Sequence, residues 1–249
     1  MRIIKALLAG AVLLAVSFAS VAQEEEAPEM YSYASYLECG GGPLSVVDDL
    51  VAEDAERMDG LVDDGTIAHW GWLAHHTGGN WQRVFYHQAD SVEALLDGSA
   101  AINDRDDDDD AKADDAAFGS VCNRHEDYIW QVENGNGGEE RGAAGFSVYL
   151  MCDSANETRA DEIVDAHVAP IMDGLVEDGS LTSWGWSSHL VGGEFRRLQT
   201  MTATDHKALL AGRAKAIDGI YADDSAMGVE FNEICSTHVD YMWNIISEK

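Results

Sequence analysis

Basic residues are scarce in this chain. It has 15 lysines and arginines against 46 aspartates and glutamates, so its formal net charge is -31 over 249 residues. A surface this acidic repels nucleic acid and anionic membranes, and neither is an expected partner. Solubility, including solubility in a salty environment, explains the charge without a specific cationic partner.

Long apolar segments are absent beyond the N-terminus. There a short basic start precedes the apolar run Ala6–Val16 and a small-x-small site at Ser20–Ala22. This layout predicts a secretory signal peptide over residues 1–22, followed by an acidic N-terminal segment over residues 23–30. A membrane anchor would need about 20 apolar residues, and no cysteine follows the cleavage site to carry a lipid. We therefore expect a secreted or periplasmic protein with no membrane insertion in its mature form.

Metal-binding motifs are also missing. The four cysteines include no CxxC pair, no CxxCH haem-attachment motif and no close Cys/His cluster, so no metal site is expected. The acidic run Asp104–Asp110 lacks the glycine and the terminal glutamate of a calcium loop. It is expected to be a solvated loop, with weak divalent-cation binding as the alternative.

The feature that is abundantly present is internal repetition. The segment Met58–Gly65 recurs as Met172–Gly179, a spacing of 114 residues. The same spacing relates further pairs of positions: Trp70/Trp184, Trp72/Trp186, His75/His189, Gly78-Gly79/Gly192-Gly193, Arg83/Arg197 and Ala94-Leu95-Leu96/Ala208-Leu209-Leu210. Near the ends the spacing is 113, as for the pairs Cys39/Cys152, Cys122/Cys235, His125/His238, Asp127/Asp240 and Trp130/Trp243. The sequence therefore predicts two homologous repeats, residues 31–134 and 146–249, joined by a Gly-rich linker at 135–145.

The second repeat gives the clearer element pattern. The expected elements are a strand at 146–152, a helix at 157–178, two strands at 181–190 and 195–203, a helix at 205–220 and a strand at 233–245. Gly179 is placed as a helix stop and Asp205 as an N-terminal cap. Pro170 interrupts the first helix, which predicts a kink there or a helix that begins late.

This order of strand, helix, strand, strand, helix, strand resembles the ferredoxin-like unit of the dimeric α/β-barrel superfamily, which includes the antibiotic-biosynthesis-monooxygenase-like domains. The resemblance implies an α+β fold in which two such units pack sheet against sheet. Because both units lie in one chain, it implies an intramolecular pseudo-dimer. Two separate ferredoxin-like domains are the alternative, but each sheet would then leave one apolar face uncovered.

The inferred fold also predicts the disulfides. Its first and last strands are antiparallel neighbours, so the end of one lies beside the start of the other. A secreted protein with paired cysteines favours disulfides over metal sites. The expected bridges are Cys39–Cys122 and Cys152–Cys235.

Strand alternation sorts the candidate site residues into faces. The predicted catalytic groups are His125, Asp127, His238, Asp240, Arg83 and Arg197. An aspartate beside a histidine can orient it for acid–base chemistry, and an arginine can hold a carboxylate or an enolate. The alternatives are a solvated His–Asp pair at the end of a sheet and countercharges in an acidic protein.

The predicted ligand-binding residues are Trp70, Trp72, His75, Trp184, Trp186 and His189. An aromatic wall with a few polar groups is the usual lining of a small-molecule pocket. The same aromatic residues at strand spacing also suit an ordinary core. Because some relatives in the superfamily bind haem through a histidine, His75, His189, His125 and His238 are the candidate haem ligands, and spacing does not choose among them.

Two functions remain open at this point. One is a secreted or periplasmic small-molecule-binding α/β-barrel protein, for which the resemblance implies oxygenase-like chemistry. The other is a non-catalytic binding or structural scaffold module. A cavity lined by Trp, His and Arg would favour the first, and a barrel filled by side chains would favour the second.

Overall fold

The computed structural model describes residues 29–105, 109–137 and 141–249. The expected signal peptide, most of the acidic N-terminal segment and part of the run at 104–110 lie outside these residues. Within the described residues, no helix is long and apolar enough to cross a membrane.

Each repeat forms four strands with helices between them. The first repeat contains β1 (Met30–Cys39), α1 (Leu44–Asp63), β2 (His69–Gly78), β3 (Arg83–Ala89), α2 (Val92–Asn103), α3 (Asp109–Val121) and β4 (Cys122–Gly137). The second contains β5 (Ala144–Met151), α4 (Glu157–Ile163), a π-helix (Val164–Val168), α5 (Ala169–Glu177), β6 (Ser183–Val191), β7 (Arg197–Ala203), α6 (His206–Ile220), a 3-10 turn (Ala222–Asp224), α7 (Ala226–Ile234) and β8 (Thr237–Glu248). The expected Gly-rich linker begins inside β4, which continues to Gly137.

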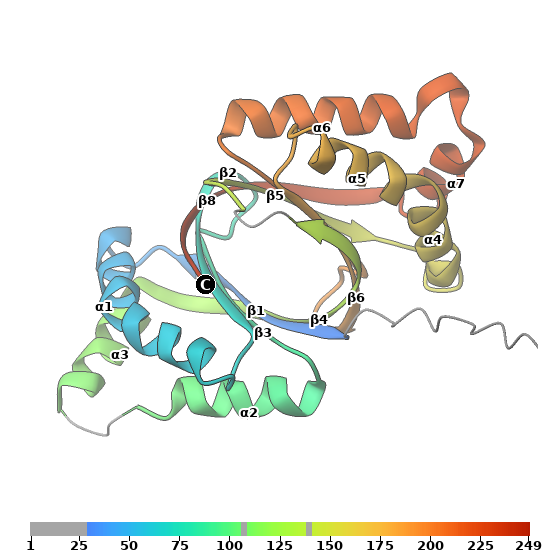
Figure 1. Ribbon diagram of the computed structural model, residues 1–249. Helices are drawn as coiled ribbons and strands as arrows, with labels where there is room; N and C mark the ends of the chain where they lie inside the picture. Colours follow the sequence, from blue (N-terminus) through green and yellow to red (C-terminus); the bar gives the residue numbers. More distant parts are fainter. Residues whose placement is uncertain (1–28, 106–108, 138–140) are drawn as a thin grey trace, which may run out of the picture.

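The eight strands form one closed barrel in the order β1-β3-β2-β8-β5-β7-β6-β4. Antiparallel pairing of β2 with β8 and of β4 with β6 joins the two repeats. Helices α1–α3 cover one side of the barrel and α4–α7 cover the opposite side (Figure 1). The expectation of a shared α/β barrel is thus confirmed, and the alternative of two separate domains is wrong.

The extra helices α3 and α7 depart from the expected element order. Each lies between the second helix and the last strand of its repeat, so β8 begins at Thr237 rather than at residue 233. Part of the run expected to be an acidic loop belongs to α3, which begins at Asp109. Each of these helices packs an aromatic ring on an outer tryptophan of its sheet, Phe118 against Trp72 and Phe231 against Trp186.

Local signals set the helix ends as expected. The Asp205 carboxylate accepts hydrogen bonds from the backbone N–H groups of Lys207 and Ala208 at the start of α6. Gly179 follows α5 with a φ of 76°, a left-handed conformation that suits glycine at a helix stop. Pro170 lies in the first turn of α5, directly after the π-helix.

That π-helix explains why the repeat spacing changes from 113 to 114 residues. Asp48 and Asp161 occupy equivalent positions at a spacing of 113, whereas Met58 and Met172 are related by 114. The second repeat therefore carries one additional residue in its first helix. A π-helical turn accommodates such an insertion without displacing the flanking helical residues.

Aromatic side chains fill the barrel interior. The inward-facing cluster contains Ala34, Tyr36, Trp81, Val84, Tyr86, Tyr128, Trp130, Tyr149, Phe195, Leu198, Tyr241 and Trp243. Tyr128 stacks on Trp130 at a ring separation of 4.9 Å, and Tyr241 stacks on Trp243 at 5.0 Å. The barrel is therefore a packed core.

The repeated glycine pairs fit between the two halves. Added Cβ atoms at Gly79 and Gly193 would lie 2.2 Å and 2.4 Å from the hydroxyls of Tyr241 and Tyr128, each in the opposite repeat. The Tyr241 hydroxyl also accepts a hydrogen bond from the backbone N–H of Asn80. These positions in the β2–β3 and β6–β7 connections need glycine because a ring from the other repeat packs directly on the backbone.

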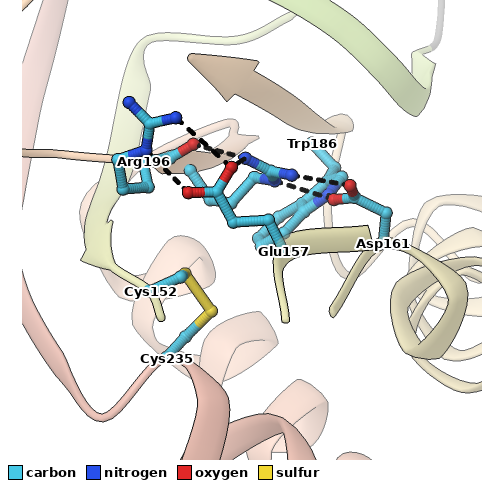
Figure 2. Close-up of a disulfide and its surroundings, with 7 residues drawn as sticks. Cys152, Glu157, Asp161, Trp186, Arg196 and Cys235 are labelled. Atoms are coloured by element: carbon cyan, nitrogen blue, oxygen red, sulfur yellow. Dashed lines mark hydrogen bonds and ion pairs between the residues drawn. A yellow bond between two sulfur atoms is a disulfide. The ribbon is translucent and has the colours of Figure 1, made fainter. Parts of the chain in front are cut away.

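Both expected disulfides are confirmed. Cys39 bonds Cys122 and Cys152 bonds Cys235, each across 83 residues of sequence. The first bridge joins the end of β1 to the start of β4. The second lies between the residue after β5 and the end of α7, beneath the Glu157 and Arg196 side chains (Figure 2).

Candidate functional site

The outer face of each sheet carries a Trp–Asp–Arg cluster that fastens the first helix of the repeat. Asp48 of α1 accepts hydrogen bonds from Arg83 Nε (2.7 Å) and Nη2 (2.6 Å), and from Trp72 Nε1 (2.8 Å). Burial alone would raise the pKa of Asp48, but the hydrogen bonds from Arg83 and Trp72 outweigh it and hold this pKa below its ordinary value.

The second repeat reproduces this cluster. Asp161 accepts hydrogen bonds from Arg197 Nε (2.8 Å) and Nη2 (2.7 Å), and from Trp186 Nε1 (2.9 Å) (Figure 2). Glu157 adds ion pairs to Arg196 at 2.7 Å and to Arg197 at 3.1 Å. The two arginines predicted as catalytic therefore hold helices to the sheet, with their guanidinium groups buried and engaged by carboxylates.

The outer tryptophans serve the same attachment. Trp70 Nε1 donates to Asp59 of α1, and Trp184 Nε1 donates to Asp173 of α5. All four predicted tryptophans thus lie between sheet and helices with their indole N–H groups bonded to helical aspartates.

His75 and His189 point the other way, toward the barrel core, as strand alternation predicts. His75 contacts the rings of Tyr241 and Trp243, and His189 contacts those of Tyr128 and Trp130. The Nε2 atom of each is buried without a hydrogen-bond partner in the described structure. Burial lowers the pKa of both imidazoles below the ordinary histidine value.

The predicted His–Asp pairs form on the helix-facing side of the last strands. His125 Nε2 lies 3.2 Å from Asp127 Oδ2, and His238 Nε2 lies 3.6 Å from Asp240 Oδ1. Asp127 also accepts a hydrogen bond of 2.7 Å from Ser35. Both histidines are largely exposed. His125 and Asp127 line a pocket of the first repeat.

That pocket lies between the sheet of the first repeat and helices α1, α2 and α3. Its volume is about 410 Å³, within the usual range for small-molecule sites. Strands β1, β2, β3 and β4 all contribute residues to its floor. The lining residues are Tyr33, Ser35, Leu50, Val51, Asp54, Arg57, Met58, Trp70, Phe85, His87, Ser99, Ile102, Asn103, Arg105, Asp114, Asp115, Phe118, His125 and Asp127. A smaller hollow of about 210 Å³ shares several of these residues and adds Leu37 and Trp72.

His87 is the most deeply buried polar side chain of this lining. It is 2% exposed, and its Nε2 atom lies 3.1 Å from the Leu95 carbonyl oxygen and 3.1 Å from Ser99 Oγ. A carbonyl oxygen only accepts, so Nε2 carries the proton and Nδ1 has a free lone pair. Nδ1 is buried without a partner in the described structure. Burial lowers the His87 pKa, so the ring is neutral at neutral pH.

The candidate haem ligands do not match a haem site. His75 and His189 pack on aromatic rings of the filled barrel, and His125 Nε2 is engaged by Asp127. His238 is likewise paired with Asp240 on the second sheet. In the described part of the chain, no group of three His, Cys, Asp or Glu residues is placed to hold a metal ion.

The sequence missed much of the pocket lining. Tyr33, His87 and Ser99 were not predicted as site residues, although His87 shares a strand face with Arg83. A signal does exist in the repeat alignment, because these positions correspond to Phe146, Met201 and Arg213 in the second repeat. Divergence between duplicated positions marks the place where the two halves differ in side-chain size and charge.

Similarity to known proteins lies in structure rather than in sequence. No protein-family model matches the chain, and no curated protein sequence matches it. Solved structures match over nearly the whole chain. A proposed monooxygenase from Lactobacillus acidophilus NCFM has a TM-score of 0.59 at 6% identity, covering 89% of this chain and 96% of its own.

Two further structures agree. A proposed monooxygenase from Fusobacterium nucleatum subsp. nucleatum has a TM-score of 0.59 at 7% identity, over 90% of this chain and 94% of its own. An anthrone oxidase-like protein has a TM-score of 0.54 at 14% identity, with the same coverage. Together with the closed eight-stranded barrel, these similarities show that this chain has the fold of the dimeric α/β-barrel superfamily, with both halves in one polypeptide.

Proposed function

We propose that this protein binds a small molecule in the pocket of its first repeat, between the sheet and helices α1–α3. The observation that carries the proposal is the pocket itself, about 410 Å³ in volume, which has the buried His87 side chain among its aromatic and charged lining. A concave space with an apolar wall and a few polar groups is the usual form of a small-molecule site.

The second repeat and the barrel interior have a structural role in this proposal. The aromatic cluster leaves the barrel packed, and the pockets of about 410 and 210 Å³ both lie in the first repeat. In this proposal the barrel is the structural scaffold, and the ligand binds outside it. The chain acts as an intramolecular pseudo-dimer with one open ligand site.

A substitution that fills the pocket with a larger side chain tests the site. Ser99→Arg places in the pocket the side chain that the equivalent position of the second repeat already carries, and Ala100→Arg adds the same charge to an exposed neighbour on α2. Ligand-observed NMR with a library of neutral, cationic and anionic fragments should find compounds that bind the intact protein and Ala100→Arg but not Ser99→Arg. The proposal fails if no fragment distinguishes the two variants while both remain folded by circular dichroism.

Oxygenase-like chemistry is the second candidate function. It is favoured by the names of the structural neighbours and by a neutral imidazole that can accept a proton beside the pocket. Dioxygen uptake with the fragments that bind would be measured in the wild type and in His87→Met. Uptake that the variant loses would support this reaction class, and no uptake with any bound fragment would leave binding as the function.

Action outside the cytoplasm completes the proposal. Two disulfides and the N-terminal sequence pattern support it. N-terminal sequencing of the protein from its source should begin near Gln23. Native mass spectrometry of the same sample would reveal a retained ligand. A mature chain that begins at Met1 would contradict secretion through this signal.

A further inference from the structure

The pocket of the first repeat has a filled counterpart in the second. Helices α2 and α6 share the pattern Ala-Leu-Leu-x-Gly, and the next residue is Ser99 in the first and Arg213 in the second. The two helices also sit alike on their sheets. A Cβ added at Gly98 would meet Ile67, and one added at Gly212 would meet Leu181, the equivalent residue. Positions 99 and 213 therefore face the same space in the two halves.

In the second repeat a cation occupies this space. The Arg213 guanidinium carbon lies 4.6 Å from the centroid of the Phe146 ring. Its Nη2 atom pairs with Asp240 Oδ2 at 3.1 Å. An aromatic face and a carboxylate, contributed by β5 and β8, thus hold one guanidinium group.

The first repeat has both partners but lacks the cation. Tyr33 takes the place of Phe146, because each pairs with the equivalent residue of the neighbouring strand, His87 or Met201. Asp127 takes the place of Asp240. Tyr33, Asp127 and Ser99 all line the pocket, and no lysine or arginine pairs with Asp127 in the described part of the chain.

We propose that the pocket of the first repeat takes a small organic cation of the guanidinium or ammonium class, held by Tyr33 and Asp127 as Arg213 is held by Phe146 and Asp240. This inference rests on the proposed binding function and names the ligand class of the same site. Arg213 acts as a covalent stand-in for that ligand in the closed half.

The remaining polar groups of the pocket suit such a ligand. Four aspartates and two arginines line it. Both arginines are already paired, Arg57 with Asp54 and Arg105 with Asp114. Of the four aspartates, Asp127 is the one that no arginine pairs with in the described part of the chain. A strongly acidic protein also attracts cations over long range.

The test uses three probes of nearly the same shape, namely benzamidinium, benzamide and benzoate, with the full chain. Isothermal titration or ligand-observed NMR should show benzamidinium bound at least about tenfold more tightly than benzamide, with benzoate weakest. Asp127→Asn, which keeps an acceptor for Ser35, should weaken benzamidinium by about tenfold. Glu126→Gln removes the same charge from the adjacent, oppositely facing residue and should leave affinity within about twofold.

The second repeat gives an independent readout. Arg213→Ser removes the stand-in and should raise the benzamidinium stoichiometry from one to two per chain. A stoichiometry that stays at one would overturn the equivalence of the two sites. The cation class would be overturned if benzamide or benzoate bound as tightly as benzamidinium and also lost binding in Ser99→Arg. The binding function would then still stand. If no fragment depends on Ser99, the binding function itself fails.

Discussion

Arg83 and Asp48 form a two-point ion pair across the interface between β3 and α1, with N–O distances of 2.7 and 2.6 Å. The Arg83 side chain is only 7% exposed. Asp48→Ala would leave this guanidinium buried without its partner, a change that costs about 3–5 kcal/mol. Denaturant unfolding should show that loss. Glu162→Ala, which breaks the exposed pair with Arg159, should cost about 1 kcal/mol or less. Equal losses for the two variants would mean that the buried pair does not anchor α1.

The two disulfides should contribute similar stability because they close loops of equal length. In the chain-entropy model a loop of this size contributes about 4 kcal/mol. Replacing Cys39 and Cys122 by alanine, or Cys152 and Cys235, should lower the free energy of unfolding by comparable amounts in denaturant titrations. Non-reducing peptide mapping of the wild type should recover both links within repeats. A link between the repeats would contradict the strand pairing.

His87 should make stability fall as the pH is lowered. Burial holds its folded-state pKa below the ordinary value of about 6.5, so the unfolded chain binds the proton more readily. Its contribution is complete above about pH 7, declines as the pH drops through 6.5, and stops changing below the folded-state pKa. His87→Met, which installs the residue found at position 201, should flatten the dependence of unfolding free energy on pH between 7 and 5. His69→Gln, at an exposed site, is the control. An unchanged slope in His87→Met would refute the assignment.

Neither repeat should be a stable monomer by itself. An isolated first repeat, residues 29–137, would expose the edges of β2 and β4 and the inward rings of Tyr36, Tyr128 and Trp130. It should aggregate or form a homodimer that rebuilds the barrel. Size-exclusion chromatography with light scattering distinguishes these states. A soluble, well-folded monomer of either repeat would argue that the barrel is not needed for folding.

Local patterns in the sequence predict much of this fold. The alternation of Tyr128 and Trp130 with Asp127 assigned these residues to opposite faces, and the structure places the rings inside the barrel and the carboxylate outside. The disulfides followed from the order of strands, because antiparallel neighbours bring Cys39 beside Cys122. Strand alternation can be predicted from the sequence because it depends only on neighbouring residues along the chain. The repetition can be seen by direct comparison of the two halves of the chain.

The candidate site depended on contacts that no local pattern records. Arg83 and Arg197 have the residue type expected of a catalytic group, but their role was decided by Asp48 and Asp161 on helices more than 30 residues away. The sequence by itself determined the duplication, the strand faces and the bridges. Only the tertiary structure decided that the barrel is full and that the open space lies beneath α1–α3, because an empty volume depends on which side chains meet across elements. Ser99 leaves that volume open and Arg213 fills its counterpart, a difference in side-chain size that matters only once the helices lie on their sheets.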